Sequence, residues 1–497
     1  MKSLRFLIVI LLSAMSFVAC NTKGDSATLE LARTSLYFSD WGASAQTISY
    51  NASNAVSVSV GSYSTGWNAT VDMYAQKITV WPVGTNEEGM TNDDLPKEGS
   101  IVINALNEAG DATSYSIYVY ISSAEVLDEE GRANCYVVAK PSASYTFDVM
   151  HRPDGVALDT KEVKLLWQSN SDVVKNVEFV EDKVIFYIPS SADDESRLED
   201  TNAVIAAYNG AGEVIWSWHL WIVNENPLLA TDTYSNSKTF MRQNLGAFTN
   251  SNGEANEQKI LDSYGMYYQW GRKDPFPRPL YFNASGAENE GCYNIDGVYL
   301  SENYLERAST DGTVAYTLKN PMHYICNSEN SEYSGDIGNG VGDWLVTADN
   351  RLWSDTQKSV YDPCPYGWRV PTADDMLVLK LADAEDNTPL ETARGQYGWH
   401  LSDDNNNKFF YPACGRRRYN DGKVENMNSK DYDYHPDTGK PVQPEPWEGH
   451  YWTSSTTTDG QAVSLYFDLT TTRTINKFVG QQPRFRANGF QIRCVRE

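Results

Sequence analysis

Alternation of polar and apolar residues with a period of two dominates the first half of the chain. Residues 55–60 read AVSVSV, 77–81 read KITVW and 114–121 read SYSIYVYI. Successive side chains of a β-strand point to opposite faces, so this period predicts strands with one buried face. Turn-forming clusters such as NEAGD at 107–111 separate them at the short spacing of antiparallel sandwiches. We therefore expect an immunoglobulin-like all-β sandwich over residues 29–124.

A second all-β sandwich is expected over residues 130–227. It ends with the strand-like stretch GEVIWSWHLW at 212–221. The period of two places Trp216, Trp218 and Leu220 on one face of this strand and Ser217, His219 and Trp221 on the other. We interpret His219 as an imidazole packed in a sheet rather than as a ligand.

Residues 230–497 differ in composition and in predicted loop length, with longer loops that are rich in glycine, asparagine and aspartate. Apolar residues at helical spacing predict a helix over 257–270. The TADD sequence at Thr372 resembles a capping box and predicts a second helix that continues through Leu381. The fold class expected for the chain is therefore multidomain, with two all-β sandwiches followed by a compact α+β domain.

The N-terminus carries the features of an export signal. Two cations precede an apolar run at 6–15, and the sequence FVAC ends at Cys20. Because this run is too short to span a bilayer, we expect a cleaved signal peptide over residues 1–19. Its end resembles the lipobox of bacterial lipoproteins, which implies a diacylglycerol-modified thiol on Cys20 and a tether over 20–28. The expected location is the outer membrane, lipid-anchored and exposed at the cell surface.

The charge of the chain argues against nucleic acid as a partner. The formal net charge is −26, and removal of Lys2 and Arg5 with the signal makes it −28. Phosphate backbones are bound by clustered lysine and arginine, which such a surface opposes. The aromatic content of 12% suits β-sheets and also suits surfaces that stack on sugars.

The first sandwich resembles the BACON-type domains of Bacteroidetes surface proteins. The resemblance rests on SLYF at 35–38, GWNATV at 66–71 and GSIVI at 99–103. That family is often called carbohydrate-binding, but no site residue is transferred. The second sandwich is similar to modules that precede the C-terminal domain in gut Bacteroidetes lipoproteins.

Six motifs along residues 238–497 occur in a fixed order. They are FMRQNLG at 240–246, YGMYYQWGRKDPFP at 264–277, DPCPYGWRVPT at 362–372, YPACG at 411–415, GHYWTSS at 449–455 and GFQIRCVRE at 489–497. In these motifs the region resembles the Fibrobacter succinogenes major paralogous domain family (FISUMP). The resemblance implies a C-type-lectin-like fold that presents a ligand surface on its loops.

Two cysteines of these motifs are candidates for a disulfide bond. Pro363 and Pro365 stiffen the turn that carries Cys364, and Cys494 lies in the alternating strand IRCV. A bridge between them would tie the C-terminal strand to this turn in an oxidising compartment. Two packed thiols are the alternative. The expectation for the other cysteines is a weaker candidate pair, Cys292 with Cys326, and two buried free thiols, Cys135 and Cys414.

No motif of a known catalytic or metal centre is found in the sequence. The six histidines lack metal-ligand spacing, and CxxC, GxSxG and glycine-rich phosphate loops are absent. Asp343 and Glu448 lie near aromatic residues and are the candidates for a carboxylate pair, although solvated charge is the simpler interpretation. Acidic loops at 403–407 and 431–437 offer oxygen ligands, so calcium stays an alternative to the expected absence of a cofactor. We expect no enzymatic activity.

Ligand recognition is expected on loops of the C-terminal region, because recognition is commonly placed on loops of a rigid scaffold. The candidate ligand-binding residues are Arg416, Arg417, Arg418, Tyr419, Trp447, His450 and Tyr451. The competing interpretation places Tyr451 and Trp452 in the core of a strand.

The predicted function is adhesion or recognition of a glycan or a host or bacterial surface protein. One alternative is a tip or accessory subunit of a surface fimbria. Another is a glycan-capturing lipoprotein of a polysaccharide uptake system.

Overall fold

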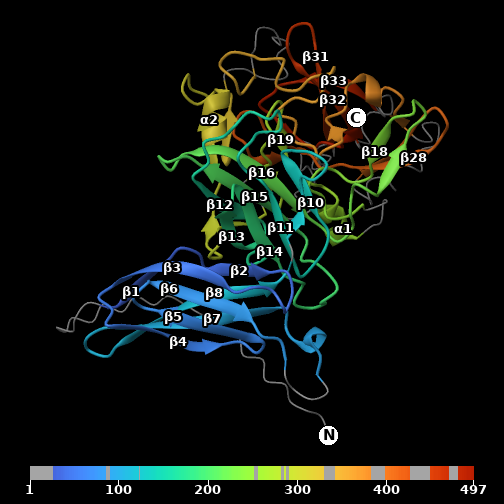
Figure 1. Ribbon diagram of the computed structural model, residues 1–497. Helices are drawn as coiled ribbons and strands as arrows, with labels where there is room; N and C mark the ends of the chain where they lie inside the picture. The colour runs from blue at the N-terminus through green and yellow to red at the C-terminus, as the bar shows by residue number, and fades with distance from the viewer. Residues whose placement is uncertain are drawn as a thin grey trace, which may run out of the picture. The chain divides into compact units, whose positions relative to one another are not determined.

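The protein consists of two compact units, Met1–Ser123 and Ala124–Glu497, which are described separately. The computed structural model describes residues 26–85, 90–122, 124–250, 256–280, 285–286, 290–328, 342–381, 398–425, 448–468 and 479–497. Both units are built mainly of β-strands, as the sequence predicts (Figure 1). None of the described helices has the length and apolar character needed to cross a membrane.

The first unit is a sandwich of two four-stranded sheets. One sheet has the order β1 (Thr28–Leu31), β3 (Gln46–Ser53), β6 (Lys77–Pro82) and β5 (Trp67–Asp72). The other has the order β2 (Ser35–Phe38), β8 (Ala112–Ile121), β7 (Glu98–Leu106) and β4 (Ser57–Tyr63), and η1 (Asn92–Asp94) is a 3-10 turn. The inward positions of the alternating strands, such as Ile117 and Val119, are fully buried around Trp67. Burial of these alternate side chains explains the period of two.

Two further sheets begin the second unit. One has the order β13 (Lys175–Val180), β14 (Lys183–Ile188), β11 (Ala143–Asp148) and β9 (Glu125–Val126). The other has the order β10 (Cys135–Val138), β16 (Val214–Ile222), β15 (Thr201–Tyr208), β12 (Glu162–Gln168), β21 (Cys292–Tyr293) and β22 (Tyr299–Leu300). In the latter, Gln168 of β12 pairs with Tyr293 of β21. The C-terminal segment thus extends a sheet of the preceding sandwich.

Strand β16 is buried on both faces. Trp218 contacts Phe147 edge to face at 5.5 Å in the sandwich core. On the opposite face Trp221 belongs to a second core that contains Trp270 and Trp452. The two faces are those predicted from the alternation. The segments 130–227 and 230–497, which the sequence analysis treats as separate domains, lie in one compact unit on either side of this strand.

A buried polar cluster crosses from β16 to the segment after Trp270. Lys273 Nζ donates to the Ser217 carbonyl at 2.9 Å and to Asp274 Oδ1 at 2.6 Å, and Ser217 Oγ donates to the same carboxylate. Burial lowers the pKa of Lys273, which Asp274 opposes. His219 lies in the same layer, fully packed, with Nε2 2.9 Å from Asn202 Oδ1. Each polar group on this face therefore has a partner, as burial requires.

The remaining described strands of the second unit form small sheets and two-residue pairings. They are β17 (Thr231–Thr233), β18 (Thr239–Met241), β35 (Val495–Arg496) and β25 (Trp368–Arg369); β19 (Tyr268–Gln269), β34 (Gly489–Phe490), β29 (Arg416–Arg417), β30 (Val424–Glu425) and β20 (Ser285–Gly286); β23 (Asn303–Glu306) and β24 (His323–Cys326); β26 (Lys380–Leu381), β27 (Gly398–Ser402) and β28 (Lys408–Pro412); and β31 (Glu448–Thr456), β32 (Ala462–Asp468) and β33 (Val479–Arg484).

The two predicted helices are much shorter than expected. The first is α1 (Glu257–Asp262), which ends before Gly265, a residue with a φ of +74°. A Cβ at Gly265 would lie 2.7 Å from the Leu245 carbonyl oxygen, so the chain turns there and Tyr268 enters a strand. Helix α2 (Val314–Lys319) was not predicted. Few described residues are helical, so a lectin-like α+β fold stays a prediction.

At the second predicted helix the capping box forms, but a single turn follows it. Thr372 N donates to Asp375 Oδ2 and Asp375 N donates to Thr372 Oγ1. The turn is the 3-10 helix η2 (Asp374–Met376). Lys380 then pairs with Ser402, so strand pairing overrides the local helical pattern.

The motif DPCPYGWRVPT forms a tightly bonded turn. The Asp362 carboxylate accepts from Cys364 N at 2.8 Å and from Val370 N at 2.9 Å. Lys358 Nζ donates to the carbonyls of Cys364, Pro365 and Trp368. Cys364 is bonded to Cys494, the pairing expected from the sequence. The other described cysteines are buried and free, so the expected pairing of Cys292 with Cys326 is wrong in this structure.

Removal of the disulfide by the double substitution C364A/C494A is expected to lower the free energy of unfolding by about 2–5 kcal/mol, because the bridge closes a long loop in the unfolded chain. Urea denaturation under oxidising conditions measures the change. Wild-type protein with reductant should approach the stability of the variant. An unchanged denaturation midpoint in the variant would contradict a stabilising bridge.

A candidate ligand-binding groove

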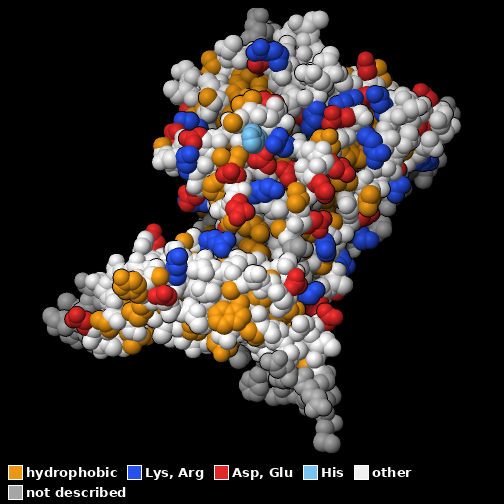
Figure 2. All heavy atoms as spheres, in the orientation of Figure 1, with side chains coloured by type: hydrophobic (Ala, Val, Ile, Leu, Met, Phe, Trp, Pro, Cys, Tyr) orange, Lys and Arg blue, Asp and Glu red, His pale blue; other side chains and the backbone are white. Residues whose placement is uncertain are grey.

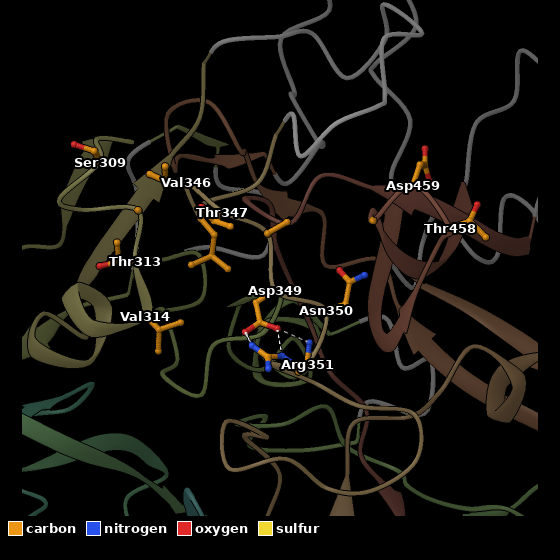
Figure 3. Close-up of a pocket in the computed structure, with 14 residues that line it drawn as sticks. Ser309, Thr313, Val314, Val346, Thr347, Asp349, Asn350, Arg351, Thr458 and Asp459 are labelled. Carbon is orange, nitrogen blue, oxygen red and sulfur yellow. Dashed lines mark hydrogen bonds and ion pairs between the residues drawn. The ribbon is translucent and has the colours of Figure 1, made fainter.

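An open groove of about 1070 Å³ lies on the second unit, formed by three segments that are distant in sequence. Figure 3 shows the segment before α2 on one side, residues 345–351 in the middle and the 458–460 turn on the other side. The lining residues are Ser309, Gly312, Thr313, Val314, Leu345, Val346, Thr347, Ala348, Asp349, Asn350, Arg351, Thr458, Asp459 and Gly460. The volume lies at the upper end of the range typical of small-molecule sites.

Two buried tryptophans hold the ends of the central segment. Trp344 Nε1 donates to the Trp270 carbonyl at 2.8 Å, and Trp353 Nε1 donates to the Tyr361 carbonyl at 3.0 Å. Gly312 lets the segment 309–314 lie close to the central segment, because a Cβ at this position would lie 2.7 Å from the Trp344 carbonyl oxygen. The groove is therefore positioned by the core rather than by a free loop.

Asp349 and Arg351 form an ion pair in the middle of the groove. Asp349 Oδ1 accepts from Arg351 Nε and Oδ2 accepts from Nη2, both at 2.8 Å, and Oδ1 also accepts from Arg351 N at 2.9 Å. These hydrogen bonds hold the pKa of Asp349 below its usual value. The Arg351 side chain is 89% exposed, so the pair faces solvent.

Asn350 lies between Asp349 and Arg351 in the sequence, and its side chain is oriented by a hydrogen bond from Arg486. Arg486 Nη2 donates to Asn350 Oδ1, and Nη1 lies 3.4 Å from Asp343 Oδ2. The guanidinium lies 4.2 Å from the centre of the Trp270 ring. Since arginine is only a donor, this hydrogen bond turns the amide oxygen of Asn350 toward Arg486 and leaves the amide nitrogen without a partner among the described residues.

Asp343, a carboxylate candidate from the sequence, lies beneath the groove and is not among its lining residues. Burial raises its pKa to about 6, which the charge of Arg486 opposes. The other candidate, Glu448, is hydrogen-bonded to His450 Nε2 at 2.8 Å. The two carboxylates have separate partners.

The walls combine hydroxyl groups with a small apolar surface. Val346 is 47% exposed. The hydroxyls of Ser309, Thr347 and Thr458 form no hydrogen bond with another described residue. Asp459 Oδ1 accepts from Thr457 Oγ1, which closes the turn of the opposite wall. The arrangement offers donors, acceptors and apolar contact within one open groove.

Most described residues of the predicted ligand surface are buried, which corrects that prediction. Arg417, His450 and Tyr451 are 0% exposed and Arg416 is 7% exposed. Arg418 and Tyr419 are partly exposed but are not groove residues. Trp447 and Cys20 lie outside the described residues.

Arg417 and its neighbours are buried because the fold uses their polar groups internally. Arg417 Nη1 lies 3.0 Å from Glu302 Oε2 and donates to the Tyr304 hydroxyl at 2.9 Å. Tyr451 donates its hydroxyl to the Pro412 carbonyl at 2.7 Å, and the His450 ring stacks on Phe490 at 4.4 Å. These residues support the scaffold, and the competing core interpretation of Tyr451 is correct.

The loop at 403–407, a calcium candidate, is a self-bonded turn between β27 and β28. The Asp403 carboxylate accepts from the backbone nitrogens of Asn405 and Asn407 at 2.9 and 3.0 Å. No cluster of three or more metal-ligating side chains of His, Cys, Asp or Glu is present among the described residues. The second calcium candidate, 431–437, lies outside them.

Sequence reasoning missed the groove residues. The only local signal is a run of polar residues, TADNR at 347–351, that follows Asp343 and Trp344. The two walls come from segments before and after it, and no spacing rule joins them.

Comparison with known proteins assigns no family. No protein-family profile matches the chain, and no curated protein sequence matches it. Among solved structures, SGBP-B of the Bacteroides ovatus mixed-linkage glucan utilization locus, in complex with a mixed-linkage heptasaccharide, is similar at 11% identity and a TM-score of 0.12, over 38% of this chain and 43% of that chain. The N-terminal four Ig domains of Dscam1 are similar at 12% identity and a TM-score of 0.13, over 40% of this chain and 52% of that chain. The human desmocollin-1 ectodomain is similar at 9% identity and a TM-score of 0.15, over 45% of this chain and 44% of that chain.

The chain spans less than half the length of the SGBP-B structure. The TM-scores are those of partial overlaps between β-rich chains, and they assign neither a fold nor a ligand.

Substitution of Arg417 by alanine is expected to lower the free energy of unfolding by about 3–5 kcal/mol, because it leaves the buried Glu302 carboxylate unpaired. The matched control is Arg418→Ala, which removes a partly exposed pair with Asp421 and should cost at most about 1 kcal/mol. Urea denaturation compares the two variants. Equal, small losses would contradict a scaffold role for Arg417.

Proposed function

We propose that the protein is a non-catalytic lipoprotein of the outer membrane that recognises a glycan in the groove between residues 309–314, 345–351 and 458–460. The observation that carries the proposal is the lining itself. Hydroxyls, an oriented amide and an ion pair border an exposed valine in an open groove. Sugars present hydroxyls and apolar CH faces together, so this mixture complements them.

The groove residues carry no aromatic ring, so hydrogen bonds and the contact with Val346 provide the binding energy. Such binding is weak for a single site, and we expect a Kd of about 10 µM to 1 mM. Recognition of this strength suits a surface protein that meets polymeric glycans with many repeats, because repeated sites raise the overall affinity.

The signal and lipobox-like sequence support anchoring at Cys20. The resemblances of residues 29–124 and 238–497 to BACON-type and FISUMP domains support a surface role. Capture of a glycan as part of an uptake system is compatible with the same groove, and a fimbrial tip or accessory role has no specific structural support.

Replacement of Cys20 by serine is expected to move the protein from the membrane pellet to the soluble fraction, because the acyl chains provide the anchor. Fractionation of cells labelled with a radioactive fatty acid measures both location and lipid incorporation. Ser26→Ala, beyond the predicted lipidation site, is the control and should behave as wild type. Continued membrane association of the unlabelled C20S protein would contradict lipid anchoring.

Asn350→Ala is expected to weaken glycan binding about tenfold, because it removes the oriented amide donor. The measurement uses the mature chain with Cys20→Ser on a glycan array, followed by calorimetry on the best ligand, with calcium and with a chelator. Asn51→Ala, an exposed strand residue of the first unit, is the matched control. We expect equal binding with the chelator.

Two results would contradict this proposal. Saturable binding that Asn350→Ala leaves unchanged would place the ligand elsewhere. A folded protein that binds nothing on the array would exclude glycan recognition and favour a protein partner.

A further inference from the structure

We propose that the groove selects uncharged glycans over acidic ones, and that Asp349 sets this selectivity by occupying the guanidinium of Arg351. The inference rests on the proposed function and names the substrate class of the same groove.

Among the described residues, one cation lines the groove. Among its lining residues Arg351 is the only lysine, arginine or histidine, and Figure 3 shows it beside Asp349 with the ion pair drawn between them. An acidic sugar is usually held by the paired donors of such a guanidinium, which match a carboxylate or sulfate. Here the Asp349 carboxylate already accepts hydrogen bonds from Nε and Nη2 of Arg351, at 2.8 Å each. An acidic ligand would have to displace a carboxylate that is only two residues away.

The remaining charge of the lining is negative. Asp459 stands on the wall opposite α2, and its carboxylate has a hydroxyl partner but no cationic partner among the described residues. With Asp349 and Arg351 neutralising each other, one negative charge is left in the groove. An anionic ligand would meet this charge at short range, where salt screens it least.

Two described cations lie behind the lining, and both donate their hydrogen bonds to groups inside the fold rather than into the groove. Arg486 forms an ion pair with Asp343, and its Nη2 donates a hydrogen bond to Asn350 Oδ1. Arg307 Nη1 donates to the carbonyls of Leu345 and Asp343. On the visible face of the second unit basic and acidic side chains lie interspersed (Figure 2), and the whole chain carries a net charge of −26. This excess of acidic residues opposes the approach of anions to the chain as a whole.

The same residues suit a neutral polyol. The Asn350 amide nitrogen donates, Asp459 accepts from sugar hydroxyls, and the Ser309, Thr347 and Thr458 hydroxyls do either. None of these contacts requires a charge on the ligand.

The test compares neutral oligosaccharides with their uronate counterparts, which differ only by the carboxylate at C6. Hexasaccharides of β-1,4-mannan and β-1,4-mannuronan, and of β-1,4-glucan and β-1,4-glucuronan, are titrated into the mature C20S chain. We expect wild type to bind at least one neutral member about tenfold or more tightly than its uronate.

Asp349→Asn should reduce that preference about fivefold or more by strengthening uronate binding, and this gain should fade between 50 and 500 mM salt. The asparagine side-chain oxygen can still accept from Arg351 N, so the turn is retained. Asp296→Asn makes the same change in net charge at an exposed turn elsewhere and should leave the preference unchanged. Should Asp349→Asn fail to fold, Arg351→Gln replaces it, and the ratio of neutral to uronate affinity should then rise above that of wild type.

Equal or tighter binding of uronates by wild type would overturn the inference and leave glycan recognition standing. An unchanged preference in a folded Asp349→Asn variant would also overturn it. Absence of binding to every oligosaccharide would overturn the proposed function, and the inference with it.

Discussion

The second unit depends on a strand that is buried on both faces. A strand at the surface can leave its polar side chains in water, but β16 has a core on each side. Ser217 and His219 must therefore find partners inside the protein, because an unpaired buried polar group costs more than a hydrogen bond returns. Lys273 and Asp274 supply them for Ser217, and Asn202 supplies one for His219. These contacts bind the C-terminal segment to the sandwich.

A second constraint is the turn at 362–370, which follows the groove segment along the chain and is joined to the last strand. Lys358 and Asp362 satisfy its backbone, and the bond from Cys364 to Cys494 joins it to the last strand. The groove segment 345–351 lies between this turn and Trp344, whose indole is tied to Trp270. The groove residues are thus held in place by packed tryptophans and by a crosslinked turn.

Charge is distributed differently in the scaffold and in the groove. Buried arginines such as Arg417 and Arg493 contact carboxylate, carbonyl or aromatic groups of the interior. These arginines therefore stabilise the fold and are not presented at the surface. Among the described residues, the exposed Arg351 is paired with Asp349 at the surface. A single substitution can therefore change the charge of the groove without removing a buried contact.

The sequence by itself determined the features that depend on neighbours along the chain. The period of two located the strands and divided the faces of 214–222 correctly, and the proline-bracketed Cys364 and strand-borne Cys494 indicated the bridge. Tertiary structure decided the rest. The helix predicted over 257–270 ends early, because the chain turns at Gly265 and Tyr268 pairs with Phe490 in a sheet. Arg417 is buried because it forms an ion pair with Glu302 inside the protein. The groove is likewise assembled from three separated segments, because burial and ion pairing are set by residues that meet only when the chain has folded.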